Sequence, residues 1–60
     1  MAVTVKIKVG ETPVAFDLDF ESQRWSAPRE LPEGYFPLVT DVDEKRYELY
    51  YGGTFAEVEQ

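Results

Sequence analysis

The side chains that could do covalent chemistry in this 60-residue chain are few, and two of them are serines in the stretch "FESQRWSAPRELPEGYF" at residues 20–36. A serine nucleophile needs a neighbouring base to take its proton, and the chain contains neither histidine nor cysteine. Lysine could act as the base, but neither Ser22 nor Ser26 begins an SxxK motif. We therefore predict no catalytic residue and expect the protein not to be an enzyme.

The acidic run "DVDEKRYELYYG" at residues 41–52 is the stretch most similar to a metal site, because Asp41 and Asp43 are spaced as in a calcium loop. An EF-hand loop that begins at Asp41 needs glycine at its sixth position and glutamate at its twelfth. The chain has Arg46 and Gly52 there. The glycines of "GGT" also lack the lysine of a phosphate-binding loop. We predict a charged hairpin turn here, with no metal site and no cofactor.

The charge balance is acidic, with 12 Asp and Glu against 6 Lys and Arg and a formal net charge of -6. This balance disfavours nucleic acid and anionic membranes and favours basic partners. Asp17, Asp19 and Glu21 would recur about every 6.8 Å along one strand. That spacing raises the alternative of a phage-like acidic inhibitor that mimics nucleic acid. Because we expect Lys6 to lie opposite Asp17, an ordinary solvated polar face is the preferred interpretation.

Aromatic recognition is the remaining possibility, and it centres on the single tryptophan. Trp25 lies between Arg24 and Arg29, and tryptophan, tyrosine and arginine are the residue types enriched at binding hot spots. A small β domain also needs aromatic bulk to cover its core, so we interpret Trp25 first as a lid on the core and second as a partner contact. The predicted partner-binding residues are Arg24, Trp25, Arg29 and Tyr35, with Tyr50 and Phe55 as a second patch.

Alternating apolar and polar residues predict two paired strands in the first half of the chain. The runs "VTVKIKVG" at residues 3–10 and "VAFDLDFE" at residues 14–21 each place their apolar side chains on one face. The segment "GETP" connects them. We expect Val9 to lie opposite Val14 and Ile7 opposite Phe16, which keeps the two apolar faces together.

The second half of the chain predicts three shorter strands, at residues 37–42, 47–51 and 54–58. "DEKR" is the expected turn between the first two, and Gly52-Gly53 is the expected two-residue turn between the last two. Pairing across the glycines places Tyr50 opposite Phe55, on the face away from Leu49. Both faces of this sheet then carry aromatic side chains, so a barrel or a covering segment is needed to shelter them.

The predicted fold is all-β: a small, five-stranded, mainly antiparallel barrel or meander of SH3-like or OB-like size, in one domain of residues 1–60. The covering segment is a crossover at about residues 22–36 that contains Trp25 and two prolines. We expect at most one helical turn, in "SAPREL" before Pro32. The chain lacks the long apolar run of a signal peptide or a membrane span, so we expect a soluble, cytoplasmic protein.

Two short motifs resemble known β domains. "LPEGYF", with Tyr47 twelve residues after Tyr35, resembles the LPxGW opening and the aromatic middle strand of WW domains, which bind proline-rich peptides. "YELYYGGTFAEV" is similar to the closing hairpin of Tudor and SH3-like barrels. Both resemblances favour a small meander or barrel and imply a peptide-binding module as one alternative function. Neither motif is taken to show family membership.

The function that we expect from the sequence is protein–protein recognition by a non-catalytic, acidic β domain. Clean alternation and matched hairpin faces are typical of de novo designed scaffolds and binders, so a designed origin is one hypothesis. We expect a protein or peptide partner, and no nucleic acid, membrane or small-molecule substrate. The alternatives are the acidic inhibitor and the peptide-binding module described above.

Overall fold

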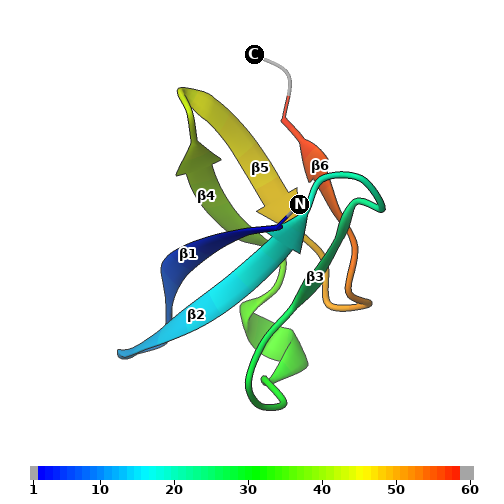
Figure 1. Cartoon of the computed structure of the whole chain (residues 1–60). Coiled ribbons are helices and arrows are strands. Elements are labelled where there is room, and N and C mark those ends of the chain that lie inside the picture. The colour runs from blue at the N-terminus through cyan, green and yellow to red at the C-terminus, as the bar shows by residue number, and fades with distance from the viewer. Residues whose placement is uncertain (1, 59–60) are drawn as a thin grey trace.

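The protein folds into two small antiparallel sheets (Figure 1). The structure is a computed structural model that describes residues 2–58. The first sheet has the strand order β1-β2-β3, and the second has the order β4-β5-β6. The strands of the first sheet are β1 (Ala2–Val9), β2 (Thr12–Asp19) and β3 (Arg24–Ser26). Those of the second sheet are β4 (Leu38–Val42), β5 (Lys45–Leu49) and β6 (Phe55–Glu57). A 3-10 turn, η1 (Glu33–Tyr35), lies in the crossover between the sheets.

The all-β, antiparallel prediction is confirmed, with six strands in residues 2–58 where five were expected. The additional strand is β3, which pairs with β2 and places Trp25 opposite Leu18. An isolated bridge between Arg24 and Thr54 connects the two sheets. The described residues form two separate sheets rather than one closed barrel, so the barrel part of the prediction is not confirmed.

The β1–β2 hairpin has the predicted apolar faces but not the predicted register. A two-residue turn at residues 10–11, with Gly10 at a φ of +66°, places Ile7 opposite Val14. The predicted register, with Val9 opposite Val14, is therefore wrong by two positions. Side chains alternate along a strand with a period of two, so this shift keeps the apolar residues on the same face. Glycine at the first central position favours the tight turn, because that position requires a positive φ.

The corrected register also changes the polar pairs across the hairpin. Lys6 lies opposite Ala15, and not opposite Asp17 as predicted. Thr4 takes the position opposite Asp17, and its hydroxyl donates a hydrogen bond of 2.6 Å to the Asp17 carboxylate. The solvent-facing side of this hairpin thus uses a neutral donor where an ion pair was expected.

The β5–β6 hairpin differs from the prediction by one position, which moves Phe55 to the other face. Its loop has three residues, 51–53: the Tyr50 N–H donates to the Thr54 carbonyl (2.8 Å), and the Gly53 N–H donates to the Tyr50 carbonyl (3.0 Å). Leu49 consequently lies opposite Phe55. A shift of one position reverses the face of each side chain. The predicted pairing of Tyr50 with Phe55 is therefore wrong, and Phe55 is buried.

The β4–β5 turn is shorter than the predicted "DEKR" segment. Asp43 and Glu44 form it alone, with φ values of +51° and +68°, as a two-residue type I′ turn requires. Lys45 and Arg46 therefore belong to β5. The Arg46 Nε lies 3.2 Å from the Asp41 carboxylate, across the hairpin from it.

Prolines decide where the helical turn forms. The turn predicted in "SAPREL" is not observed, and η1 begins after Pro32 instead. Ala27 and Leu31 each precede a proline, and that position disfavours the α conformation. The helical segment found in residues 2–58 is thus a three-residue turn, and it is too short to cross a membrane.

The hydrophobic core is formed by side chains from both sheets. At its edge, the partly buried rings of Phe20 and Tyr47 make edge-to-face contacts with each other and with the buried Phe55, with centroid distances of 5.2 to 5.8 Å. Full burial of an apolar side chain of this size contributes about 1.5–3 kcal/mol relative to leaving it in water. The buried apolar residues are Ile7, Val9, Val14, Phe16, Leu18, Leu38, Leu49 and Phe55.

Candidate functional site

Trp25 is the residue through which the crossover contacts both sheets. Its ring packs edge-to-face on Phe16 at 5.2 Å and stacks on Phe36 at 5.4 Å. The indole Nε1–H donates a 2.8 Å hydrogen bond to the Tyr50 carbonyl, and the Trp25 main-chain N–H donates to the Gly53 carbonyl at 2.8 Å. The side chain is half-buried. Trp25 thus covers the core as a lid, while one part of its ring remains at the surface.

Two hollows flank the crossover and share the residues Arg29, Glu30 and Leu31. The first, which we call the Trp25 hollow, has a volume of about 460 Å³. Its aromatic lining comes from Trp25 in β3 and from Tyr51 in the β5–β6 loop, two segments that are far apart in the sequence. The hollow is lined by Trp25, Ser26, Ala27, Arg29, Glu30, Leu31 and Tyr51.

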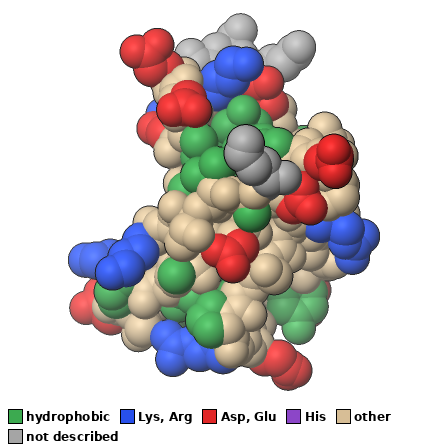
Figure 2. All heavy atoms as spheres, in the orientation of Figure 1, with side chains coloured by type: hydrophobic (Ala, Val, Ile, Leu, Met, Phe, Trp, Pro, Cys, Tyr) green, Lys and Arg blue, Asp and Glu red, His purple; other side chains and the backbone are tan. Residues whose placement is uncertain are grey.

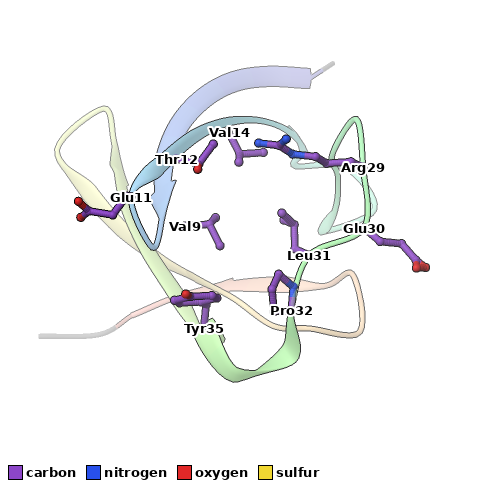
Figure 3. A pocket seen from close by; sticks show the side chains of 9 residues that line it. All are labelled: Val9, Glu11, Thr12, Val14, Arg29, Glu30, Leu31, Pro32 and Tyr35. Atoms are coloured by element: carbon purple, nitrogen blue, oxygen red, sulfur yellow. The ribbon is translucent and has the colours of Figure 1, made fainter.

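The second hollow, which we call the Val9 hollow, has a volume of about 370 Å³ and lies between the β1–β2 hairpin and the crossover (Figure 3). Its apolar lining includes two core side chains, Val9 and Val14, so the hollow reaches the edge of the core. Leu31 and Pro32 of the crossover complete that lining. The lining residues are Val9, Glu11, Thr12, Val14, Arg29, Glu30, Leu31, Pro32 and Tyr35.

The charged side chains of the Val9 hollow point in different directions. Arg29 extends over the hollow toward Val14 and Thr12, whereas Glu11 and Glu30 point away from it (Figure 3). The cation of the hollow therefore points toward Val14 of the apolar lining, and the two carboxylates point outward.

Tyr35 stands against the β1–β2 turn. A side-chain carbon at Gly10 would lie 3.0 Å from the Tyr35 hydroxyl oxygen, so the ring can approach the turn only because residue 10 is glycine. Gly10 also has a positive φ, which disfavours other residues independently of the space available. The Tyr35 side chain is nevertheless 50% exposed, and it forms part of the Val9 hollow.

The two arginines predicted as partner contacts are not engaged in ion pairs within residues 2–58, where the salt bridge is that of Arg46 with Asp41. Arg29 lines both hollows. Arg24 lies beside Gly53 and lines a third hollow, of about 410 Å³, on the β2–β3 side of Trp25. Both arginine residues are exposed.

The predicted second patch, Tyr50 and Phe55, is not a single surface. Phe55 is only 3% exposed, because the three-residue loop turns its ring toward the core. Tyr50 is exposed, and its hydroxyl donates to the Glu48 carboxylate at 3.2 Å. Partial desolvation, together with that carboxylate, raises the pKa of Tyr50. Tyr51, which the sequence analysis did not select, is 51% exposed and packs edge-to-face on Phe36 at 5.5 Å.

The acidic residues singled out from the sequence have local structural partners. Asp17 accepts the Thr4 hydroxyl, and the Asp19 carboxylate accepts the Glu21 N–H at 3.0 Å. The Glu21 hydrogen bond lowers the pKa of Asp19. Both carboxylates line the third hollow together with Arg24. On the face shown in Figure 2, Asp and Glu side chains are interspersed with Lys and Arg and form no continuous acidic stripe.

The sequence analysis identified Arg29 and Tyr35 of the Val9 hollow, but not the residues that line the hollow with them. Thr12 comes from β2, whereas Leu31 and Pro32 come from the crossover, and no sequence period connects the two segments. Leu31 could have been predicted to line a hollow from its position between two prolines, where an apolar side chain is expected to pack against the core. Among residues 2–58, no group of three or more histidine, cysteine or acidic side chains is arranged to hold a metal ion.

Comparison with known proteins does not extend this description. No protein-family model, no curated protein and no solved structure matches the chain.

Proposed function

We propose that this chain is a non-catalytic domain that recognises a protein or peptide partner through its crossover surface. We define that surface as the Trp25 hollow, the Val9 hollow and the residues that they share. One observation carries the proposal: each hollow is lined by a half-exposed tyrosine, and the two hollows meet at Arg29, Glu30 and Leu31. Tyrosine, tryptophan and arginine are enriched among the few residues that dominate the binding energy of protein interfaces.

The shape of the crossover surface favours an extended peptide. Each hollow is open and of modest volume, so it suits one anchoring side chain rather than a whole small molecule. A peptide that crosses the residues between the hollows could place one side chain in each. Rigid aromatic walls are the usual means by which small domains bind extended segments, because little side-chain entropy is lost.

The two connected sheets beside the crossover surface, which we call the frame, support the same proposal. The Arg24–Thr54 bridge and the hydrogen bond from the Trp25 N–H to the Gly53 carbonyl connect the sheets on one side. We infer that the frame acts as an incomplete barrel, in the manner of SH3-like and Tudor-like peptide-binding modules. Two prolines in the crossover restrict its backbone before any partner binds, which lowers the entropy cost of binding.

Charge mimicry of nucleic acid has weaker support. The net charge of -6 favours it, but Asp17 and Asp19 form hydrogen bonds within the first sheet and lie beside Arg24. Mimicry predicts that partner affinity falls steeply as the salt concentration rises. An interface built on Tyr35, Trp25 and Tyr51 predicts a shallow salt dependence, so a salt titration separates the two functions.

The proposal is tested by selecting peptides from random libraries displayed in two formats, one with free C-termini and one with the C-termini blocked by fusion. We expect at least one format to enrich peptides that bind the protein. Their affinity should fall at least about tenfold, or about 1.4 kcal/mol, in the double variant Arg29→Gln, Tyr51→Ser. The matched control is Val39→Ser, which removes an exposed apolar side chain on β4 that lines none of the three hollows.

Two results would overturn the proposed function. One is the absence of enriched peptides in both formats. The other is enrichment of peptides that bind the double variant as tightly as they bind the original protein. Circular dichroism of each variant must first show that the β structure is retained, which we expect because both substituted side chains lie at the surface.

A further inference from the structure

The Val9 hollow combines an aliphatic lining with one arginine and two hydroxyl side chains. We infer that it binds the C-terminal residue of a partner chain, with an aliphatic side chain against its apolar lining and the terminal carboxylate on Arg29. This inference rests on the proposed function and deepens it, because it names the part of the partner that the hollow binds.

The apolar lining is aliphatic and continuous with the core. Val9 and Val14 are buried residues whose accessible edges lie in the hollow, and Leu31 and Pro32 extend that lining from the crossover. Ligand pockets usually measure about 300–1,000 Å³. At about 370 Å³, the hollow is at the small end of that range and suits a single aliphatic residue rather than a longer segment.

The cation of the hollow has no anionic partner among the described residues. The Arg29 guanidinium points toward Val14 (Figure 3), and it forms neither a salt bridge nor a side-chain hydrogen bond in residues 2–58. Guanidinium groups bind carboxylates through two parallel hydrogen bonds. The hydroxyls of Thr12 and Tyr35 also line the hollow, and they can donate further hydrogen bonds to a bound carboxylate.

A terminal residue fits this pattern better than an internal acidic residue does. In a C-terminal leucine, valine or isoleucine, the aliphatic side chain and the carboxylate are attached to the same carbon atom, so a small hollow can hold both. An aspartate or glutamate within a chain would place its own charge over the aliphatic lining and leave that lining unfilled. Arg29 points toward Val14 of the apolar lining, which matches the first arrangement.

The charges outside the hollow indicate what precedes the terminal residue. Glu11 and Glu30 point away from the hollow into solvent (Figure 3), and the whole chain carries a net charge of -6. A partner with several acidic groups would be repelled, whereas lysine or arginine before the terminal residue would be attracted. The occupant that we infer is therefore a basic segment that ends in an aliphatic residue with a free carboxylate.

The test uses one fluorescent hexapeptide with two lysines near its N-terminus and a C-terminal leucine, prepared both as the free acid and as the amide. We expect the free acid to bind at least tenfold more tightly by fluorescence anisotropy at low ionic strength. We also expect Arg29→Gln to remove this difference. In ¹⁵N-labelled protein, the free acid should shift the amide signals of Thr12, Leu31 and Tyr35.

The matched control is Lys45→Gln, which removes one cation from the start of β5, next to the β4–β5 turn; this turn lies at the opposite end of the view in Figure 1 from η1. It should preserve the preference for the free acid. Equal affinity for acid and amide, no binding of either up to millimolar peptide, or a preference that survives Arg29→Gln would each overturn the inference. The proposed function is tested independently of these results, because library peptides with blocked C-termini cannot use a terminal carboxylate.

Discussion

The β1–β2 hairpin is held by a ladder of main-chain pairs from Ala2 to Asp19, whereas residues 27–31 of the crossover make no main-chain hydrogen bond within the described part of the chain. Residues 27–31 are held instead by side chains that pack on the core, namely Ala27 and Leu31. The prolines of the crossover also restrict its backbone before folding. The long hairpin and the short segment 27–31 are thus ordered by different forces.

This difference explains why the proposed binding surface lies on the crossover. A strand within a sheet uses its main-chain groups for the ladder and one face for the core, so few of its groups remain for a partner. A loop held by side-chain packing leaves main-chain groups and hollows at the surface.

The largest expected change in the free energy of unfolding comes from truncating Phe16, the main core side chain of the hairpin. Phe16 is fully buried, so Phe16→Ala should lower the free energy of unfolding by about 3–5 kcal/mol. A chain of 60 residues has a total stability of only about 3–9 kcal/mol, so this variant should be largely unfolded or close to it. Urea titration followed by circular dichroism measures the change. The matched crossover variant, Phe36→Ala, should cost less, because Phe36 is only half-buried. An equal cost for both would remove the distinction between the two regions.

The next largest change in the free energy of unfolding is expected for Trp25, the lid residue that connects the hairpin to the crossover. Trp25→Phe keeps an aromatic ring over Phe16 but removes the hydrogen bond from Nε1 to the Tyr50 carbonyl. We expect a loss of about 1–2 kcal/mol in the free energy of unfolding. In the original protein, the indole should show fluorescence that is only partly quenched by acrylamide, because it is half-buried. Complete quenching would contradict the lid role.

A smaller effect is expected where the hairpin turn meets the crossover. Gly10→Ala should lower stability by more than about 1 kcal/mol, because residue 10 has a positive φ and the new carbon would lie 3.0 Å from the Tyr35 hydroxyl. Tyr35→Leu should reduce this penalty in the double variant, and the size of the reduction measures the contact between the two regions. Gly52→Ala is the control, because nothing lies within 4 Å of the new carbon. An undiminished penalty in the double variant would assign the whole effect to the backbone.

The smallest expected effect is a pH dependence of stability that comes from Asp19, at the end of β2. The folded state lowers the pKa of Asp19 below its ordinary value of 3.8, chiefly through the hydrogen bond from the Glu21 N–H. The resulting stabilisation is present above pH 3.8 and is lost as the pH falls through the lowered pKa. Asp19→Asn should therefore lose less stability than the original protein when the pH is lowered across that range. Parallel acid titrations of the two proteins would contradict this assignment.

The sequence predicted the faces of the first hairpin correctly but not its register. Alternation with a period of two specifies which side chains share a face, and a shift of two positions leaves that pattern unchanged. The decisive feature was the turn, where Gly10 allows two residues to reverse the chain in place of the four expected. In the second sheet, the three-residue loop at residues 51–53 shifts the register by one position from the predicted one. The predicted face of Phe55 was therefore wrong, and its side chain lies in the core.

The candidate site was predicted only in part for a related reason. Arg29, Trp25 and Tyr35 were selected because their residue types are common at interfaces, and the structure places all three on the crossover surface. Tyr51 was not selected, since its exposure depends on the loop that also buries Phe55. Residue type is visible in a sequence, but exposure depends on the register of hairpins distant in the chain.

By itself, the amino-acid sequence determined that this protein is a small antiparallel β domain without histidine or cysteine chemistry, because composition and the period of alternation are local properties. Only the tertiary structure decided that Val9, Thr12 and Arg29 surround one hollow and that Trp25 and Tyr51 line another. These residues come together because two sheets must cover a common core, and the crossover follows the path that their packing leaves.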